Sequence, residues 1–381
     1  MATAVQQAPR THEEAAAALA AASAEGLSVR IVGGATKLGW GHVTDPAAIE
    51  LHTSGLDRIL EHNAGDLTAE LEAGVRLAEA QRAFAEHGQM LALDPPLGGD
   101  PGATIGGIVA TGDCGPLAHR YGGPRDLVVG ARLALSDGTI AHSGGKVIKN
   151  VAGYDLAKLF VGSFGTLGLI LSVNVRLHAM PAATTTALGS SGDCQALAAA
   201  ALGLSSAPLE LAALDVAWRG GQGGLLARCD GPQARRRGER AARLMADLGL
   251  ERTEVTADDQ GLWERQRAGQ RSSSQALVRI STRPSTLASL LRAADACAGT
   301  VVGRAALGSI YVELDPDAVG RLREELPPGT VSTVLDAPPA TRAELDPWGP
   351  AQRPAIELMR RVKMRFDATG TCNPGLFVDR I

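Results

Sequence analysis

Three clusters of glycine are the residues whose type and spacing point most directly to chemistry. They lie at residues 33–37, 98–123 and 162–168. Glycine lets successive backbone N–H groups converge on an anion, and only small residues let the backbone approach a pyrophosphate closely. Any one cluster is better explained as a set of tight turns, but three in order on one stretch of chain favour binding of a phosphate-bearing cofactor.

The clusters do not fit the common nucleotide-binding motifs. Neither G-x-G-x-x-G nor G-x-x-x-x-G-K-[ST] occurs, which disfavours a Rossmann helix and a P-loop. The first cluster, "GGATK", follows the apolar run "LSVRIV" and is expected to form one wall of an anion site, with Thr36 offering a hydroxyl. "ATIGG" and "YGGPRD" could form another wall, where Arg125 is expected to pair with Asp126 or a nearby carbonyl rather than with phosphate.

Local patterns predict the elements around these clusters. Thr11 to Glu14 is a capping box that begins a helix running to about Ala24, and residues 27–32 read as a buried strand. Residues 76–88 have helical spacing, and Asp137-Gly138 marks a hairpin turn. The block at 91–126 holds nine glycines and five prolines, so we expect one or more long ordered loops there and no regular structure.

The domain organisation follows from length and from a change in character after residue 180. A chain of 381 residues suggests two or three domains at roughly 150 residues each. Residues 181–349 alternate Ala/Leu/Arg-rich helices with short strands and predict an α+β domain. Residues 350–381 predict a helix with Ile356, Met359, Val362, Lys363 and Phe366 on one side, ended by an Asn-Pro-Gly turn.

Composition excludes several classes of function. The net charge of -4 gives no long-range attraction for nucleic acid, and no apolar run reaches the ~20 residues that a membrane helix needs. The five cysteines form no C-x-x-C pair, which indicates a reducing, cytoplasmic setting. We therefore expect no nucleic acid partner and no direct membrane insertion; any association with the inner membrane is expected to go through a partner.

Four stretches carry a resemblance to a known family: "RIVGGATKLGWG", the run from Asp94 to Gly138, the run from Gly144 to Ile170, and "RFDATGTCNPG". The sequence resembles the FAD-binding domain of the vanillyl-alcohol oxidase and p-cresol methylhydroxylase (PCMH) superfamily, most of all the FAD-binding E subunits of bacterial glycolate oxidases. The resemblance implies an α+β fold: a two-subdomain PCMH-type FAD-binding domain at 1–180, an α+β cap domain at 181–349, and a C-terminal helix and tail at 350–381 that return to the FAD domain.

By matched position, the resemblance also implies which residues bind the cofactor. Gly33, Gly34, Ala35, Thr36 and Lys37 would be the first pyrophosphate loop; Thr104, Ile105, Gly106, Gly107, Thr111, Gly115, Tyr121 and Gly122 would line the second; and Gly165, Gly168 and Ile170 would close on the cofactor. Some relatives tether FAD through a His or Cys. Cys114 and His119 lie where a tether occurs in some members, yet we expect non-covalent FAD. His42 and Trp40 are expected to be packing residues.

The sequence differs from the relatives that oxidise 2-hydroxy acids themselves in the residues available for catalysis. Those relatives carry an H-x-x-G-D-G-N-x-H metal motif in the cap domain. All eight histidines lie at or before His178, so the cap and the tail offer no His-based metal site and no His general base. We therefore expect no metal site and name no catalytic residue. The expected function is an FAD-binding subunit of a glycolate oxidase complex that relays electrons between a catalytic FAD subunit, which binds the 2-hydroxy acid, and an iron-sulfur subunit.

Two alternatives remain open. The first is a stand-alone FAD oxidoreductase acting on a small hydroxylated substrate, and the second is a structural subunit that has lost its flavin. Three smaller features have plainer explanations than a site. Asp155, beside Tyr154, is expected to accept a hydrogen bond from the nearby backbone. Arg235 to Arg237 are expected to form a solvated helix face. Ser272 to Ser274 are not expected to belong to a hydrolase triad, because no His lies nearby in the sequence.

Overall fold

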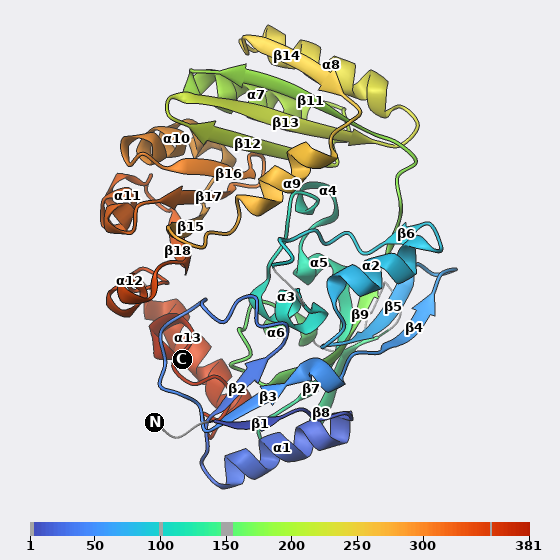
Figure 1. Ribbon diagram of the computed structural model, residues 1–381, viewed down its shortest axis with the longest axis vertical. Coiled ribbons are helices and arrows are strands. Elements are labelled where there is room, and N and C mark those ends of the chain that lie inside the picture. The colour runs from blue at the N-terminus through green and yellow to red at the C-terminus, as the bar shows by residue number, and fades with distance from the viewer. Residues whose placement is uncertain (1–3, 99–101, 146–154, 351–352) are drawn as a thin grey trace. The chain divides into compact units, whose positions relative to one another are not determined.

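The chain forms two compact units, which Figure 1 shows for a computed structural model of the protein. The structure describes residues 4–98, 102–145, 155–350 and 353–381. Unit 1 comprises residues 1–114, 122–180 and 350–381, and unit 2 comprises residues 115–121 and 181–349. No helix in the described part of the chain is long and apolar enough to cross a membrane.

Unit 1 begins with a small parallel sheet and a covering helix. The strand order is β1 (Val5–Gln7), β3 (Ile49–His52), β2 (Val29–Val32), with both pairs parallel. The helix α1 (His12–Ala24) starts as the sequence predicts, because the Thr11 hydroxyl accepts the N–H of Glu14. The Glu14 carboxylate reaches one residue further back than an ordinary capping box does and accepts from Arg10 N. Alanines and Leu19 of α1 are buried in a core of aliphatic side chains.

A five-stranded antiparallel sheet forms the rest of the framework of unit 1. Its order is β4 (Ile59–Asn63), β5 (Thr68–Glu72), β9 (Leu169–Arg176), β7 (Val128–Ala134), β8 (Ile140–Gly144). The predicted hairpin at Asp137-Gly138 is confirmed, since β7 and β8 pair antiparallel across it and Gly138 has φ +84°. A two-stranded sheet joins β6 (Gln89–Met90) to β10 (His178–Ala179).

The helices of unit 1 include one that the sequence pattern did not predict. Two further helices confirm their predictions: α2 (Leu77–Ala85) and the C-terminal α13 (Arg353–Phe366). The unit also has short helical elements: α5 (Pro124–Leu127), α6 (Ala157–Phe160) and the 3-10 turns η1 (Thr53–Gly55) and η4 (Val378–Arg380). The prediction of no regular structure at 91–126 is wrong, because α3 spans Ile105–Thr111. Buried Ile105, Ile108 and Val109 have helical spacing, Thr104 caps the start, and Gly112 at φ +63° ends the helix.

Unit 2 is an eight-stranded antiparallel sheet with helices on its faces. Its order is β14 (Arg252–Thr256), β11 (Thr184–Ser191), β13 (Gln222–Asp230), β12 (Ala213–Arg219), β16 (Thr300–Arg304), β17 (Ser309–Leu314), β15 (Ala276–Ser281), β18 (Val331–Asp336). Its helices are α7 (Cys194–Ser206), α8 (Ala234–Asp247), α9 (Gln260–Ala268), α10 (Leu287–Ala296), α11 (Val319–Glu325) and α12 (Pro339–Glu344), with 3-10 turns η2 (Pro284–Thr286) and η3 (Pro316–Ala318). Helices α7, α8, α10 and α11 share one large apolar core with the sheet, whereas Trp263 of α9 packs in a separate small cluster with Ala213 and Leu226.

The segment 115–121, with its short helix α4 (Ala118–Tyr121), belongs to unit 2 although the residues on either side of it belong to unit 1. Buried Arg304 of β16 donates to the carbonyl oxygen of Gly115 (2.9 Å). At the other end, Arg120 and Tyr121 donate to the two carboxylate oxygens of Asp230 (2.8 and 3.2 Å). We call residues 115–121 the strap, because polar contacts hold it to unit 2 at both ends.

Candidate cofactor-binding site

A pocket in unit 1 brings the three glycine clusters together, although they are far apart in the sequence. Its described lining includes twelve of the sixteen residues that the resemblance assigns to the cofactor: Gly33, Gly34, Ala35, Thr36, Lys37, Thr104, Gly106, Gly107, Thr111, Gly165, Gly168 and Ile170. Apolar side chains complete it, among them Ile31, Leu38, Trp40, Phe164, Leu169 and Leu376. A pocket of this kind suits a ligand with both an apolar part and an anionic part.

The loop 33–37 follows β2 and supplies free backbone donors. Among the described residues, nothing accepts the backbone N–H groups of Gly34, Ala35 and Thr36. Ala35 has φ +56°, and a positive φ within such a run turns successive N–H groups toward the same side. Three adjacent free donors on a pocket wall are what a pyrophosphate requires.

Lys37, at the end of this loop, is not a free cation. Its ammonium nitrogen lies 3.3 Å from Asp113 Oδ2, and both side chains are buried. It also lies 5.8 Å from the centre of the Trp40 ring. Because Asp113 offsets its charge, the groups of the pocket that can attract an anion are the backbone N–H groups of residues 34–36 and the side chain of Arg30, which also lines it. Trp40 is buried, as expected for a packing residue, and it lines the pocket as well.

The second wall, α3, differs from the first in that the N–H groups of its first turn are already used. Three donor–acceptor pairs account for them: Ile105 to the Val75 carbonyl (2.8 Å), Gly106 to the Ala73 carbonyl (2.8 Å) and Gly107 to the Thr104 hydroxyl (3.3 Å). A Cβ at Gly106 would lie 2.6 Å from the Ala73 Cβ. The glycine therefore lets α3 pack against the end of β5, and α3 contributes shape to the pocket rather than free donors.

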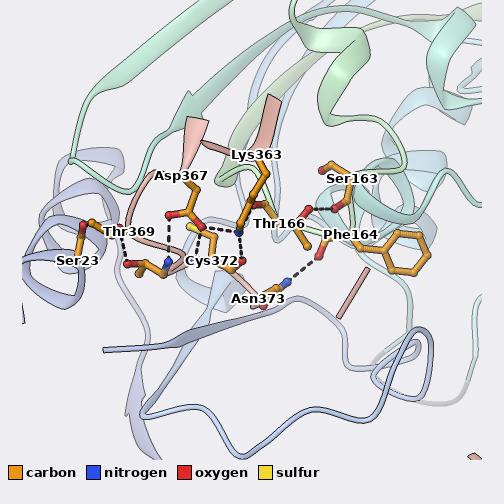
Figure 2. Close-up of polar contacts among 10 residues, drawn as sticks. Ser23, Ser163, Phe164, Thr166, Lys363, Asp367, Thr369, Cys372 and Asn373 are labelled. Carbon is orange, nitrogen blue, oxygen red and sulfur yellow. Dashed lines mark hydrogen bonds and ion pairs between the residues drawn. The ribbon is translucent and has the colours of Figure 1, made fainter. Parts of the chain in front are cut away.

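The third wall is the turn at 162–168, which leads into β9. Gly162, Gly165 and Gly168 have φ of +77°, +70° and +140°, and Phe164 among them has φ +56°. The turn is attached to α3, since Gly162 and Phe164 donate their N–H groups to the carbonyls of Val109 and Ala110. Figure 2 shows the Phe164 carbonyl accepting from the Asn373 side chain. Such positive φ values for a non-glycine residue persist only where the surroundings hold them.

Four of the sixteen predicted residues lie elsewhere. Ile105 is fully buried in the packing of α3, and Gly122 lies in a turn where a Cβ would come within 2.4 Å of Asp126 Oδ2. Gly115 and Tyr121 are in the strap of unit 2. Burial and the negative charge of Asp230 raise the pKa of Tyr121, so its phenol stays protonated and donates to that carboxylate.

Sequence reasoning also missed residues that line the pocket. Asn373, from the Asn-Pro-Gly turn, and Thr53, Ala73 and Arg30 are part of the lining. Asn373 and Arg30 carried a signal, since both belong to stretches that resemble the family. Tyr154 lies outside the described residues, whereas exposed Asp155 lies 3.7 Å from the ammonium of Lys158.

The candidates for a covalent tether do not line the described pocket. Cys114 carries a half-buried thiol, and His119 lies in the strap, where burial lowers its pKa. The residues described as lining the pocket include no His and no Cys. Within the described parts of the chain, no group of three or more His, Cys, Asp or Glu side chains is placed to hold a metal ion.

Comparison with known proteins shows which class of domain contains this pocket. The family model described as "FAD binding domain" matches residues 4–144. The chain therefore carries an FAD-binding domain, and the resemblance to PCMH-type flavoproteins is confirmed. FAD is the cofactor of this domain, and the free N–H groups of residues 34–36 fit its pyrophosphate.

The similar curated proteins match part of the chain. A D-lactate dehydrogenase of Archaeoglobus fulgidus is 38% identical over 169 residues, which is 44% of this chain and 37% of that protein. Glycolate oxidase subunit GlcE of Escherichia coli is 38% identical over 126 residues, 33% of this chain and 36% of GlcE. The chain spans about a third of the length of the curated relatives it matches, 30% to 38% in those compared.

A likeness in structure extends over nearly the whole chain. A crystal structure of an alkyldihydroxyacetonephosphate synthase superposes with a TM-score of 0.70 at 14% identity, covering 97% of this chain and 75% of that one. At this identity the likeness shows the fold alone. It confirms the predicted α+β class, with a PCMH-type FAD-binding fold.

Proposed function

We propose that this chain is the FAD-binding subunit of a glycolate oxidase-type complex that oxidises 2-hydroxy acids, and that it passes electrons on rather than taking them from the acid. Its relatives support the class of reaction, since they include glycolate oxidase subunits GlcE and GlcD, D-lactate dehydrogenases and a D-2-hydroxyglutarate dehydrogenase. In this proposal a catalytic FAD subunit binds the acid, and an iron-sulfur subunit accepts the electrons.

The observation that carries the proposal is the position of the histidines. All eight lie at or before His178, so residues 181–349, which supply the sheet of unit 2, contain none. Oxidation of a 2-hydroxy acid requires a base to take the hydroxyl proton, and His is the side chain most suited to that task near neutral pH. A chain with a PCMH-type domain and no His in residues 181–349 is better suited to relaying electrons than to deprotonating substrate.

FAD, when bound, supplies reversible acceptance of one or two electrons. The chain's own residues hold it in place. The N–H groups of Gly34, Ala35 and Thr36 would bind the pyrophosphate, and the Lys37–Asp113 ion pair keeps the adjoining wall nearly neutral. Because the described lining offers no His or Cys for a tether, we propose that binding is non-covalent.

The test is reduction by substrate, measured in the isolated chain and in the assembled complex. Purified chain loaded with FAD should keep its visible flavin absorbance when glycolate or D-lactate is added without oxygen. Bleaching should appear only after the catalytic subunit is supplied. Rapid bleaching of the isolated chain would instead establish a stand-alone oxidoreductase and overturn the relay proposal.

The partners are tested by co-purification from cells that express the neighbouring genes together. We expect the chain to carry with it a second flavoprotein and a protein containing iron and acid-labile sulfide. A chain that purifies alone under gentle conditions, with FAD bound, would contradict the complex. A chain that gains no flavin absorbance on mixing with FAD would point to a structural subunit.

A further inference from the structure

The C-terminal tail contains a buried ion pair whose polar groups are all engaged. Lys363 of α13 and Asp367 just after it are almost fully buried, and their charged atoms are 2.6 Å apart. The Lys363 ammonium also donates to the carbonyls of Thr166 (2.7 Å) and Cys372 (2.9 Å), so all three of its N–H bonds are used. Asp367 accepts from the backbone N–H groups of Thr371 (3.1 Å) and Cys372 (2.8 Å). Figure 2 shows this network.

A buried ion pair of this kind is weak evidence for stability, because removing two charges from water costs about as much as their attraction returns. The contribution of this ion pair is therefore better explained by the segments of chain that it holds in position. Asp367 folds the chain after α13 back on itself, and Lys363 connects that fold to Thr166. Thr166 lies in the turn at 162–168, which forms the third wall of the FAD pocket.

Asn373 makes a second connection from the same tail. Its side-chain nitrogen donates to the carbonyl of Phe164 (2.7 Å), and its side-chain oxygen accepts from the N–H of Ile31 (2.9 Å). Ile31 is in β2, which leads into the pyrophosphate loop at 33–37. One side chain thus links two walls of the pocket that are more than a hundred residues apart in sequence. A Cβ at Gly165 would lie 2.7 Å from Asn373 Nδ2, so the fit leaves no spare room.

Asn373 lines the pocket, yet both of its side-chain polar atoms are already bonded to protein. These two bonds fix the orientation of the side chain between Phe164 and Ile31. Phe164 and Gly165, which it contacts, have φ of +56° and +70°, and residues in such conformations depend on outside support. These observations indicate that Asn373 is a positioning residue for the turn at 162–168.

We propose that Lys363, Asp367 and Asn373 form a brace that fixes the turn at 162–168 against β2 and thereby sets the affinity of the pocket for FAD. In this proposal the brace acts through the backbone of the turn. This proposal rests on the FAD site and is independent of whether the chain relays electrons.

The first test replaces Asn373. Asn373→Asp keeps an acceptor for Ile31 but removes the donor to Phe164, and Asn373→Ala removes both. Because each leaves a buried backbone group without its partner, we expect the Kd for FAD to rise about tenfold to a hundredfold in both variants. Hydrogen exchange of the amides at 163–168 should become faster in the apoprotein. An Asn373→Asp protein with wild-type Kd and exchange would overturn the role given to the Phe164 contact.

The second test removes the ion pair as a unit, which guards against loss of folding. Lys363→Met combined with Asp367→Leu leaves no unpaired buried charge, the main cost of breaking such a pair. The backbone groups of Thr166, Thr371 and Cys372 lose their partners, so we expect a lower melting temperature. We expect an apoprotein that melts cooperatively, exchanges faster at 163–168 and binds FAD more weakly. The matched control is Arg360→Met, also on α13, whose ion pair with Asp379 is mostly exposed and whose loss should leave the Kd unchanged.

The outcomes separate three cases. A lower melting temperature with wild-type Kd and wild-type exchange at 163–168 would show a purely structural role and overturn the brace. A wild-type chain that does not bind FAD would overturn the site itself. Since every measurement uses the isolated chain with FAD alone, failure of electron transfer from a 2-hydroxy acid bears on the proposed function and leaves the brace unaffected.

Discussion

The backbone of Gly34 lies so close to the carbonyl oxygen of Gly102 that a Cβ at position 34 would be 2.0 Å from that oxygen. The loop at 33–37 and the segment before α3 therefore meet through bare backbone. Gly34→Ala must push these two walls apart, and overpacking of this kind costs about 1–3 kcal/mol. We expect the Kd for FAD to rise about tenfold to a hundredfold, as measured by titration of the apoprotein with FAD.

Gly65→Ala is the control for this variant. Gly65 is in the same unit, and a Cβ there would meet only Asn63 Oδ1 at 3.6 Å, an ordinary contact. Its Kd should match the wild type. If Gly34→Ala bound FAD as tightly as Gly65→Ala does, the first loop would not be part of the pyrophosphate site.

The neighbouring glycines 106 and 107 should respond differently to substitution. A Cβ at Gly106 would lie 2.6 Å from the Ala73 Cβ, so Gly106→Val should displace α3 from β5, lower the free energy of unfolding of unit 1 by about 1–3 kcal/mol and abolish FAD retention. Gly107→Ala meets the Thr104 hydroxyl at 3.2 Å, which a small movement relieves. We expect Gly107→Ala to keep most of its FAD, as judged by the flavin absorbance of the purified protein.

The buried thiols should resist alkylation. Burial raises the pKa of Cys372 to about 12 and that of Cys229 to about 11, and the nearby carboxylates of Asp367 and Asp230 act in the same direction. Because the thiolate is the reactive form, raising the pH from 7 to 9 should not label Cys372 in the folded protein. Half-buried Cys114 should be modified first, as peptide mass spectrometry would show. Denatured protein, in which all five thiols react, is the control, and prompt native labelling of Cys372 would contradict its burial.

Glu72, at the end of β5, should make unit 1 sensitive to acid. Burial opposes its ionisation, but hydrogen bonds from Arg58 outweigh that effect and lower the pKa of Glu72 below its ordinary 4.5. A lowered carboxyl pKa gives stability that is present above the ordinary value and is lost as the pH falls through the folded value. Below about pH 4.5 the free energy of unfolding should therefore fall more steeply in wild type than in Glu72→Gln, as followed by urea titrations. Half-exposed Glu79→Gln should leave the wild-type slope unchanged.

The structural features that could be predicted from the sequence are those that local interactions determine. The helix start at Thr11 and the hairpin at Asp137-Gly138 were predictable because their deciding residues lie within a few positions of one another. The glycine-rich first loop was predictable for the same reason, since it directly follows β2. Helix α3 was missed because its glycines are needed for packing on Ala73, a contact that nothing in the local pattern reveals.

The rest depended on contacts between distant parts of the chain. Lys363 looked like one member of an amphipathic helix face, and only the fold places its ammonium on the carbonyl of Thr166, 197 residues away. Gly115 and Tyr121 sit in the same glycine-rich block as Thr104, yet their partners Arg304 and Asp230 come from a domain with no recognisable motif. No local signal separates the strap from the residues before it.

The contact between Ile31 and Asn373, 342 positions apart, also has a consequence for how the protein is made. During synthesis β2 leaves the ribosome long before Cys372, which bridges to Val29 along the free edge of this strand. Folding of unit 1 therefore cannot be completed vectorially, because non-local pairing waits for its distant partner. The turn at 162–168 can be fixed against β2 only after Asn373 has emerged, so we expect FAD capture to wait for that residue.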